Sequence, residues 1–302
     1  MSSFRTLLLD LQNGDGGWGA ARGRPSNTET TSLALMALRS DGGPDAAAAV
    51  GRALPWLRAR QRPDGAWALS AQVPGPSWTT PLAVLALGRF ESDRARALQG
   101  ARWLLEHKGR GYPWLSRLFF RLFPEREVVE LDPDLKGWPW MPDTFSWVEP
   151  TAYALMALKT LRAELPRDAA HTSIHEGERM ILDRMCPGGG WNYGNSRVLD
   201  EDLWPYPDTT ALALIALKGR PEGAESRASL AALGRMLEHN DSALATSLAI
   251  LCFHRYGRDV APLRARLIKS FGGLAALGDT RAAALSVLAL HEVGPAFAFA
   301  PS

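Results

Sequence analysis

Several features are scarce or missing in this chain of 302 residues, and each absence removes a class of protein. Only two cysteines are present, so the fold does not depend on a framework of disulfides. Charges of the two signs nearly balance, with a formal net charge of +2 and no long basic run, so we expect no nucleic-acid partner. No apolar run reaches membrane-spanning length, and the first residues lack the apolar core of a signal peptide. These absences predict a soluble cytoplasmic protein.

Strand-like alternation does not persist anywhere in the chain, and the apolar residues instead form helical segments. Six of these segments are apolar on nearly all faces and open on Thr or Ala, namely 31–38, 80–87, 151–158, 210–217, 246–253 and 283–290. More amphipathic segments such as 54–61 and 178–185 lie between them and indicate an outer layer. The sequence therefore predicts an all-α fold, a single (α/α)6 toroid of six inner/outer helix pairs.

A short phrase recurs before several of the apolar segments. Its fullest copy, 52–67, contains Gln61 and ends in Gly65-Ala66-Trp67, and further copies end at Trp18 and Trp191. Glycine tolerates positive φ, so the Gly of this phrase can end an outer helix while the glutamine bonds the freed backbone groups. We interpret the three tryptophans as structural staples that fold back over the helix ends.

These residues resemble the QW repeats of the squalene–hopene cyclase and oxidosqualene cyclase family, a likeness that extends to protein prenyltransferase β subunits. The resemblance covers most of the chain and implies a central cavity lined by aromatic side chains, with an isoprenoid small-molecule substrate. Squalene cyclases have two toroids, whereas this chain is long enough for one. We therefore expect a single domain over 1–302, with an insertion at about 108–145.

An acidic position follows from the same resemblance. Class II cyclases of the family carry an Asp-x-Asp-Asp motif at the start of one inner helix, and its central Asp protonates an alkene or epoxide. The matching segment here, 206–211, keeps only Asp208, at the proton-donor position. The six apolar segments align on Ala37, Ala86, Ala157, Ala216, Cys252 and Ala289. In this register Glu149 and Glu29 stand where Asp208 stands, so Asp208, Glu149 and Glu29 are the predicted catalytic residues.

A structural interpretation of the three carboxylates stays open. Asp208 precedes two threonines as an N-cap residue does, and Glu149 precedes a Pro that would occupy the first helical position. Negative charge also favours the N-terminus of a helix. Under the catalytic interpretation, burial and neighbouring carboxylates hold a proton on the acid, and aromatic faces stabilise the carbocation. The predicted substrate-binding aromatics are Trp78, Trp138, Trp140, Trp147, Tyr153, Trp191, Tyr193, Trp204 and Tyr206.

The predicted function is acid-initiated (class II) cyclisation of a linear isoprenoid lipid in the central cavity. The alternative is a non-catalytic isoprenoid-binding protein or a partner-dependent accessory protein, and a third class is a carbohydrate-active toroid with paired carboxylates. We expect no cofactor and no metal, and interpret His171 and His175 as part of a solvated helix face rather than metal ligands. The Arg-studded apolar segment 112–124 has three alternatives: a peripheral membrane contact, a lid, or a contact with a second copy or a partner protein.

Overall fold

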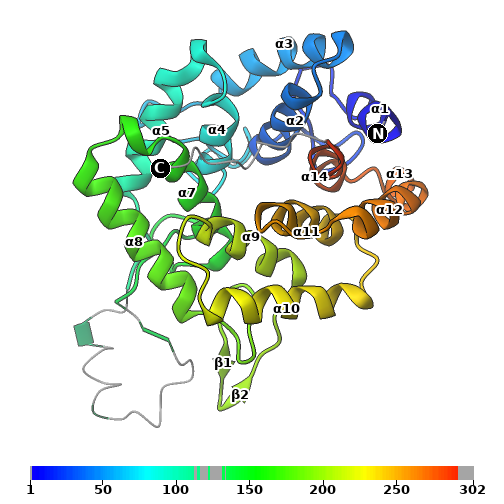
Figure 1. Ribbon diagram of the computed structural model, residues 1–302. Helices are drawn as coiled ribbons and strands as arrows, with labels where there is room; N and C mark the ends of the chain where they lie inside the picture. The colour runs from blue at the N-terminus through cyan, green and yellow to red at the C-terminus, as the bar shows by residue number, and fades with distance from the viewer. Residues whose placement is uncertain (1, 112–113, 116–121, 123–130, 133, 292–302) are drawn as a thin grey trace.

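The computed structural model describes residues 2–111, 114–115, 122, 131–132 and 134–291, which form an α/α toroid (Figure 1). Six inner helices make a closed ring in which each packs against its two neighbours. In ring order they are α2 (Thr28–Asp41), α4 (Thr80–Leu87), α7 (Val148–Thr160), α9 (Pro207–Leu217), α11 (Ala243–Arg255) and α14 (Thr280–Leu290). The ring closes where α14 packs against α2.

An outer helix covers each inner one. The outer helices are α1 (Ser2–Asp10), α3 (Pro44–Arg58), α5 (Arg94–Glu106), α8 (Arg167–Asp183), α10 (Ala224–Glu238) and α12 (Ala261–Lys269). Helix α1 packs on α14, so the two ends of the chain complete one pair, and the other five pair with α2, α4, α7, α9 and α11 in that order. The smaller elements are α13 (Phe271–Leu277), the 3-10 turns η1 (Glu91–Asp93) and η3 (Arg162–Glu164), and an antiparallel hairpin of β1 (Arg197–Val198) and β2 (Glu201–Asp202). The predicted single (α/α)6 toroid is thus confirmed.

The composition of each helix follows from its layer. Every residue of α4 is buried, because an inner helix contacts neighbours on all sides and has no face for polar residues. The outer helix α3 instead buries one stripe, which includes Ala49, Ala53 and Trp56, and leaves its charged side outward. The amphipathic segments expected at 54–61 and 178–185 are the C-terminal parts of α3 and α8, which begin earlier and end at Arg58 and Asp183.

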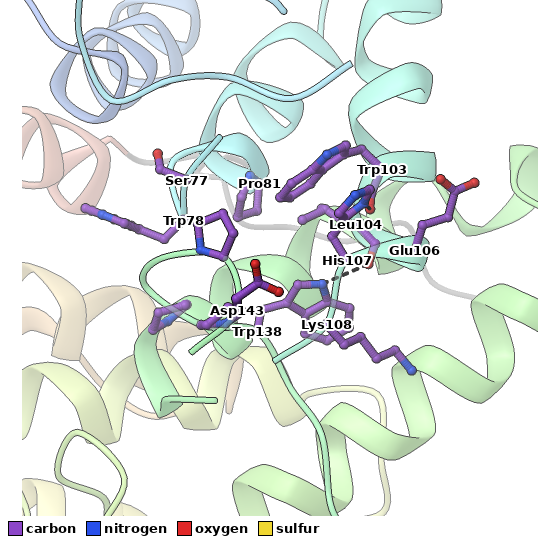
Figure 2. Close-up of a pocket in the computed structure, with 13 residues that line it drawn as sticks. Ser77, Trp78, Pro81, Trp103, Leu104, Glu106, His107, Lys108, Trp138 and Asp143 are labelled. Carbon is purple, nitrogen blue, oxygen red and sulfur yellow. Dashed lines mark hydrogen bonds between the residues drawn. The ribbon is translucent and has the colours of Figure 1, made fainter. Parts of the chain in front are cut away.

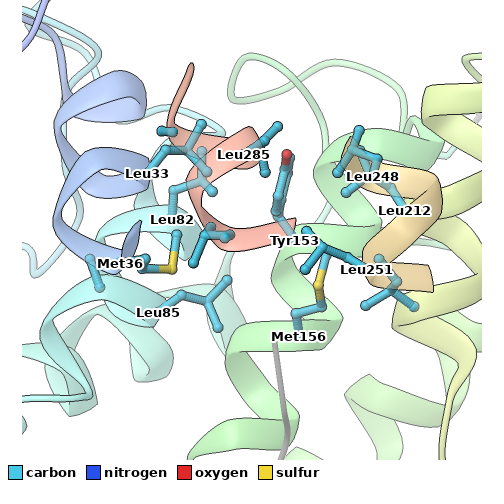
Figure 3. Packing of buried hydrophobic residues seen from close by; sticks show 14 of the residues in the cluster. Leu33, Met36, Leu82, Leu85, Tyr153, Met156, Leu212, Leu248, Leu251 and Leu285 are labelled. Carbon is cyan, nitrogen blue, oxygen red and sulfur yellow. The ribbon is translucent and has the colours of Figure 1, made fainter. Parts of the chain in front are cut away.

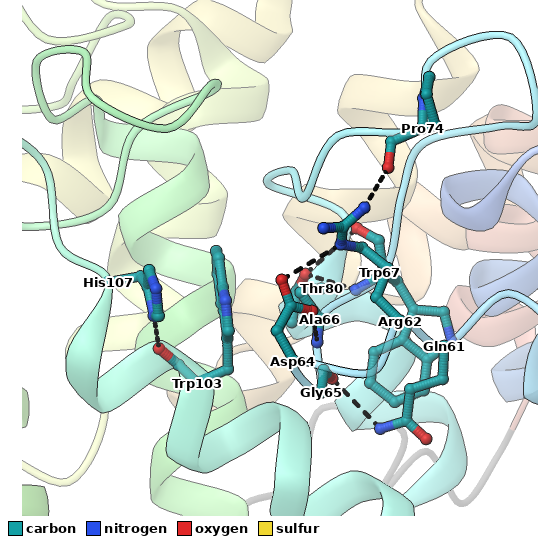
Figure 4. A network of polar contacts seen from close by, with 10 residues as sticks. All are labelled: Gln61, Arg62, Asp64, Gly65, Ala66, Trp67, Pro74, Thr80, Trp103 and His107. Carbon is teal, nitrogen blue, oxygen red and sulfur yellow. Dashed lines mark hydrogen bonds and ion pairs between the residues drawn. The ribbon is translucent and has the colours of Figure 1, made fainter.

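The recurring Gln…Gly-x-Trp phrase forms the turn between an outer helix and the next inner helix (Figure 4). Gly65 has φ +92°, and the Gln61 side chain donates to the carbonyl of Gly65 at 3.2 Å. The indole of Trp67 is buried and donates to the carbonyl of Leu57 at 2.9 Å. The backbone N–H of Trp67 donates to the Thr80 hydroxyl at 3.0 Å. The turn therefore ties the end of α3 to the start of α4, as the staple interpretation predicts.

The same two bonds recur in three other units. The indole groups of Trp18, Trp138 and Trp191 donate to the carbonyls of Leu8, Leu104 and Ile181. Their backbone N–H groups donate to the hydroxyls of Thr31, Thr151 and Thr210, each at 2.9 Å. Trp138 is thus a fourth staple, which the sequence phrase does not reveal because Lys136 stands where the other copies have the Gly of Gly-x-Trp.

Side chains with almost no solvent exposure gather at the centre of the ring (Figure 3). The residues that meet there are Leu33, Met36, Leu82, Leu85, Tyr153, Met156, Leu212, Leu248, Leu251 and Leu285. All ten are buried, and Tyr153 is the one aromatic residue among them. At this level the axis is a packed aliphatic core, which corrects the expectation of a central cavity lined by aromatic side chains.

Candidate functional site at the mouth of the ring

The first turns of the inner helices face one end of the toroid, here called the mouth. The threonines that bond the staple tryptophans fix the register of four inner helices at this end. Two residues before each of these threonines stand Glu29, Trp78, Glu149 and Asp208. The mouth position of four consecutive units therefore carries three carboxylates and one indole.

Two of the carboxylates meet at a cation from the last inner helix. Arg281, in the first turn of α14, donates from Nη2 to Oε1 of Glu149 at 2.5 Å. Its Nε lies 3.4 Å from Oε1 of Glu29. The Glu149 side chain is 4% exposed, whereas Glu29 and Arg281 are 17% and 23% exposed. One guanidinium thus bridges α2, α7 and α14 across the mouth.

This cluster holds its protons tightly because it is buried and has more carboxylates than cations. Burial raises the pKa of Glu29 to about 7, with Arg281 opposing the shift and Glu149 adding to it. Burial also raises the pKa of Glu149, against the charge and hydrogen bond of Arg281 and with a contribution from Asp208. Although burial disfavours the charged guanidinium, Tyr153 and the two carboxylates keep the pKa of Arg281 well above its ordinary value. Near neutral pH the cluster therefore keeps a proton that ordinary carboxyls would lose.

Asp208 lies beside this cluster without joining it. It is in the first turn of α9, is partly buried, and its charge raises the pKa of both Glu149 and Tyr193. Within the described part of the chain, no hydrogen bond or ion pair holds its carboxyl. Asp208 is therefore the carboxylate of the mouth that is free to meet another molecule.

None of the three carboxylates caps its helix, which corrects the capping interpretation. The N-cap residues of α2, α7 and α9 are Asn27, Trp147 and Tyr206, and the three carboxylates lie inside the first turns. In α2 the Asn27 side chain accepts the capping bond, from the N–H of Thr30. The negative charges still lie at the helix ends that favour them, but cap geometry does not explain their presence.

Aromatic side chains border the mouth on the side of α9. The rings of Tyr193 and Tyr206 lie 5.5 Å apart, and the two residues are 45% and 46% exposed. Trp204, just before α9, is 83% exposed. Trp78 packs edge-to-face on Trp140 with ring centroids 4.7 Å apart. Tyr193 and Tyr206, two of the predicted substrate-binding aromatics, are therefore open to solvent near the carboxylates.

The other predicted aromatics are less accessible. Trp147 is partly buried, as are Trp78 and Trp140. Tyr153 is fully buried below the cluster, and its hydroxyl has no well-formed hydrogen bond among the described residues, although Arg281 lies close enough to affect its pKa. Trp138 and Trp191 are buried staples whose indole N–H groups are already bonded to backbone carbonyls.

Arg281 is the residue of the site that the sequence interpretation missed, and the sequence contains the signal. In the alignment that places Glu29, Glu149 and Asp208 at one position, the sixth unit has Arg281 there. A search limited to acidic residues passes over it. A position that carries three acids and one base around a closed ring predicts an ion-pair cluster, because the six positions converge at the mouth.

The structure gives less support to two other candidate features, the histidine pair on α8 and the segment 112–124. His171 and His175 stack on α8 with ring centroids 6.4 Å apart, and the described residues contain no group of three His, Cys, Asp or Glu placed to hold a metal. Most of segment 112–124 lies outside the described residues, and Trp114, Leu115 and Leu122 within it are exposed. Throughout the described ranges, no helix combines the length and apolar character needed to cross a bilayer.

Comparison with known proteins identifies the fold. A scan against protein-family models finds no match, and a search of curated proteins likewise finds none. Among solved structures, the chain is similar to a type II terpene cyclase, MstE, from Scytonema in complex with geranylgeranyl dihydroxybenzoate. The TM-score is 0.59 and the identity 16%, over 98% of this chain and 96% of that one.

Carbohydrate-active enzymes match equally well. An alpha-amylase from Clostridium perfringens gives a TM-score of 0.61 at 12% identity, over 96% of each chain. An endo-1,4-D-glucanase from Vibrio fischeri gives 0.57 at 11%, over 95% of this chain and 93% of that one. At these identities the likeness establishes a toroid shared with terpene cyclases and glycosidases, so the function has to be argued from the site.

Proposed function

We propose that the chain is a terpene-cyclase-like enzyme that acts on a linear isoprenoid lipid by acid-initiated cyclisation at the mouth of the ring. The observation that carries this proposal is the convergence of Glu29, Glu149 and Asp208, from three inner helices, beside exposed aromatic side chains. Alkene protonation needs a carboxylic acid in a site with little water, and the burial of Glu149 and Glu29 supports such a site.

In the proposed reaction Asp208 delivers the proton. Its transfer to an alkene carbon forms a C–H bond and leaves a carbocation, which a second alkene attacks to close a ring. Loss of a proton from the product cation restores the acid, so the overall change is an isomerisation that consumes no co-reactant. Glu149 and Glu29 keep a proton at the mouth near neutral pH, and the faces of Tyr193 and Tyr206 stabilise the cation.

The packed axis favours a second candidate, a carbohydrate substrate. Leu33, Met36 and Leu285 fill the space below the mouth, so a substrate that enters this form of the protein lies across the opening. Glycans bind in open clefts, where exposed aromatic rings stack on the sugars and a pair of carboxyl groups cleaves the glycosidic bond. The two candidates differ in substrate and share the same carboxylates.

The test is incubation of the purified protein, in mild detergent, with squalene and with prenyl alcohols and diphosphates of graded length, followed by gas chromatography–mass spectrometry. A panel of glycans is incubated in parallel and analysed for cleavage. The matched variants are Asp208→Asn, at the mouth, and Asp45→Asn, an exposed first-turn aspartate on the outer helix α3. Circular dichroism and thermal unfolding show that both variants are folded.

A cyclised product that is made by the wild type and by Asp45→Asn, and is lost in Asp208→Asn, supports the proposal. Full activity of Asp208→Asn rejects Asp208 as the acid. Glycan cleavage without any cyclised product replaces the proposal with the carbohydrate candidate. Stoichiometric retention of an unchanged isoprenoid by both variants replaces it with a non-catalytic binding role.

A further inference from the structure

A pocket of about 380 Å³ lies beside the mouth, between α4, α5 and the first turn of α7 (Figure 2). Its lining includes Trp78, Trp103, Trp138 and His107, but none of the mouth carboxylates Glu29, Glu149 and Asp208. Pockets that hold small ligands range from about 300 to 1,000 Å³. An engineered apolar cavity of about 150 Å³ holds benzene, so this pocket has room for a molecule with two fused rings.

The walls of the pocket are flat and mostly apolar. Three indole rings line it together with Pro81, Pro139, Pro142 and Pro150. The imidazole of His107 stacks on the indole of Trp103 with ring centroids 4.3 Å apart and planes 7° from parallel. Flat aromatic and proline surfaces pack best against a planar group, so the shape of the walls selects an aromatic ligand.

One polar atom in the wall, Nε2 of His107, has unused hydrogen-bonding capacity. Nδ1 of His107 lies 2.9 Å from the carbonyl of Trp103 and therefore carries the proton of the neutral ring. Nε2 is then an acceptor, and none of the described residues bonds it. A hydroxyl group in the pocket can donate a hydrogen bond to this nitrogen.

The charged groups of the lining favour a neutral ligand. Lys108 is paired with Glu176 at 2.5 Å, and Asp143 with Arg110 at 2.8 Å. The remaining charge, Glu106, is exposed and would repel an anion. A neutral molecule does not have to displace either ion pair.

We propose that this pocket binds a small, neutral, planar aromatic compound that carries a hydroxyl group, with His107 accepting a hydrogen bond from that hydroxyl. The proposal does not depend on the proposed function, since no mouth carboxylate takes part in the binding.

The probe is 2-naphthol, compared with its methyl ether 2-methoxynaphthalene, which has nearly the same shape and no donor. Binding to the full chain is measured by equilibrium dialysis. His107→Phe keeps a ring that can stack on Trp103 and removes the acceptor, while His175→Phe makes the same change at an exposed site on α8. Asp208→Asn is included to separate this pocket from the mouth.

We expect 2-naphthol to bind one site, and the methyl ether to bind about tenfold more weakly, which corresponds to the loss of one hydrogen bond. The His107→Phe substitution should weaken the binding of 2-naphthol about tenfold and leave the binding of the methyl ether unchanged. The His175→Phe and Asp208→Asn variants should bind both probes as the wild type does. Equal affinity for the two probes, unchanged naphthol binding in His107→Phe, or the absence of saturable binding would each overturn the proposal. Loss of binding in Asp208→Asn would overturn its independence from the mouth.

Discussion

Helix α7 contacts a charge cluster at each end. One cluster has two carboxylates for one cation, and the other has one carboxylate for two cations. At the mouth, Glu149 and Glu29 share one cation, Arg281. At the opposite end, Glu178 accepts from two cations: Lys159 lies 2.7 Å from one oxygen and Arg220 2.9 Å from the other. Lys159 also donates to the carbonyls of Ala216 and Lys218, at the end of α9.

This difference in the ratio of carboxylates to cations distinguishes a cluster with a structural role from one suited to proton transfer. The cluster around Glu178 supplies each oxygen with a donor and uses Lys159 to satisfy carbonyls that the end of α9 leaves free. The cluster around Glu149 has two carboxylates for one guanidinium, so it gains stability by holding a proton. Of the two clusters, the one with an excess of acid over base is the one at the end of the ring where Tyr193 and Tyr206 are exposed.

The largest effect on stability is expected from Arg281→Met. The substitution leaves two carboxyls facing each other without a cation, and breaking a buried ion pair from one side costs about 3–5 kcal/mol. Because both carboxyls then hold their protons to higher pH, the loss should be greater at pH 8 than at pH 5.5. Denaturant unfolding at the two pH values measures it, and an equal loss at both would contradict the shared-proton description of the cluster.

The next largest effect is expected from Lys159→Met, at the other end of α7. The variant removes the ammonium from two carbonyls and from Glu178, but Arg220 still pairs with that carboxylate. We expect a loss of about 2–3 kcal/mol in the free energy of unfolding, of similar size at pH 5.5 and pH 8. A loss confined to pH 8 would mean that the two clusters do not differ in the way described.

Glu29→Gln should change the pH dependence of stability rather than simply lower stability. An ordinary Glu loses its proton near pH 4.5, whereas Glu29 in the folded protein holds it to about pH 7. The folded state binds more protons over this interval, so the free energy of unfolding falls as the pH rises from about 4.5 to about 7. The amide removes this titration. At pH 8 the variant should be about 3 kcal/mol more stable than the wild type, and a wild-type stability that rises over the same interval would refute the assignment.

The smallest effect is expected from Tyr153→Phe. The hydroxyl is buried without a well-formed hydrogen bond, so its removal should change the free energy of unfolding by less than about 0.5 kcal/mol. Chemical denaturation measures the change, with Tyr256→Phe as the matched control, because the Tyr256 hydroxyl donates to the carbonyl of Leu214 at 2.9 Å. A loss as large as that of the control would show that Tyr153 belongs to the Arg281 network as a bonded member.

Much of the fold could be predicted because each unit repeats its own local rules. The segment 80–87 is apolar on all sides and matches α4, and the Gly65–Trp67 turn has the positive φ and the buried indole that its residues indicate. Trp138 shows what the recurring Gln…Gly-x-Trp phrase does not predict. It makes the same bonds as the other staples, but its carbonyl partner, Leu104, is 34 residues earlier in the chain.

The sequence by itself determined the toroid, the turns that link its units, and the positions that carry Glu29, Glu149, Asp208 and Arg281, because these depend on periodicity and register. Tertiary structure alone decided which of those charges meet. Arg281 and Glu149 are 132 residues apart in the chain. Nη2 of Arg281 lies 2.5 Å from Oε1 of Glu149 only because the ring closes. The packed axis was decided in the same way, since the side chains that fill it come from all six inner helices. Their fit depends on the ring diameter, which no single repeat encodes.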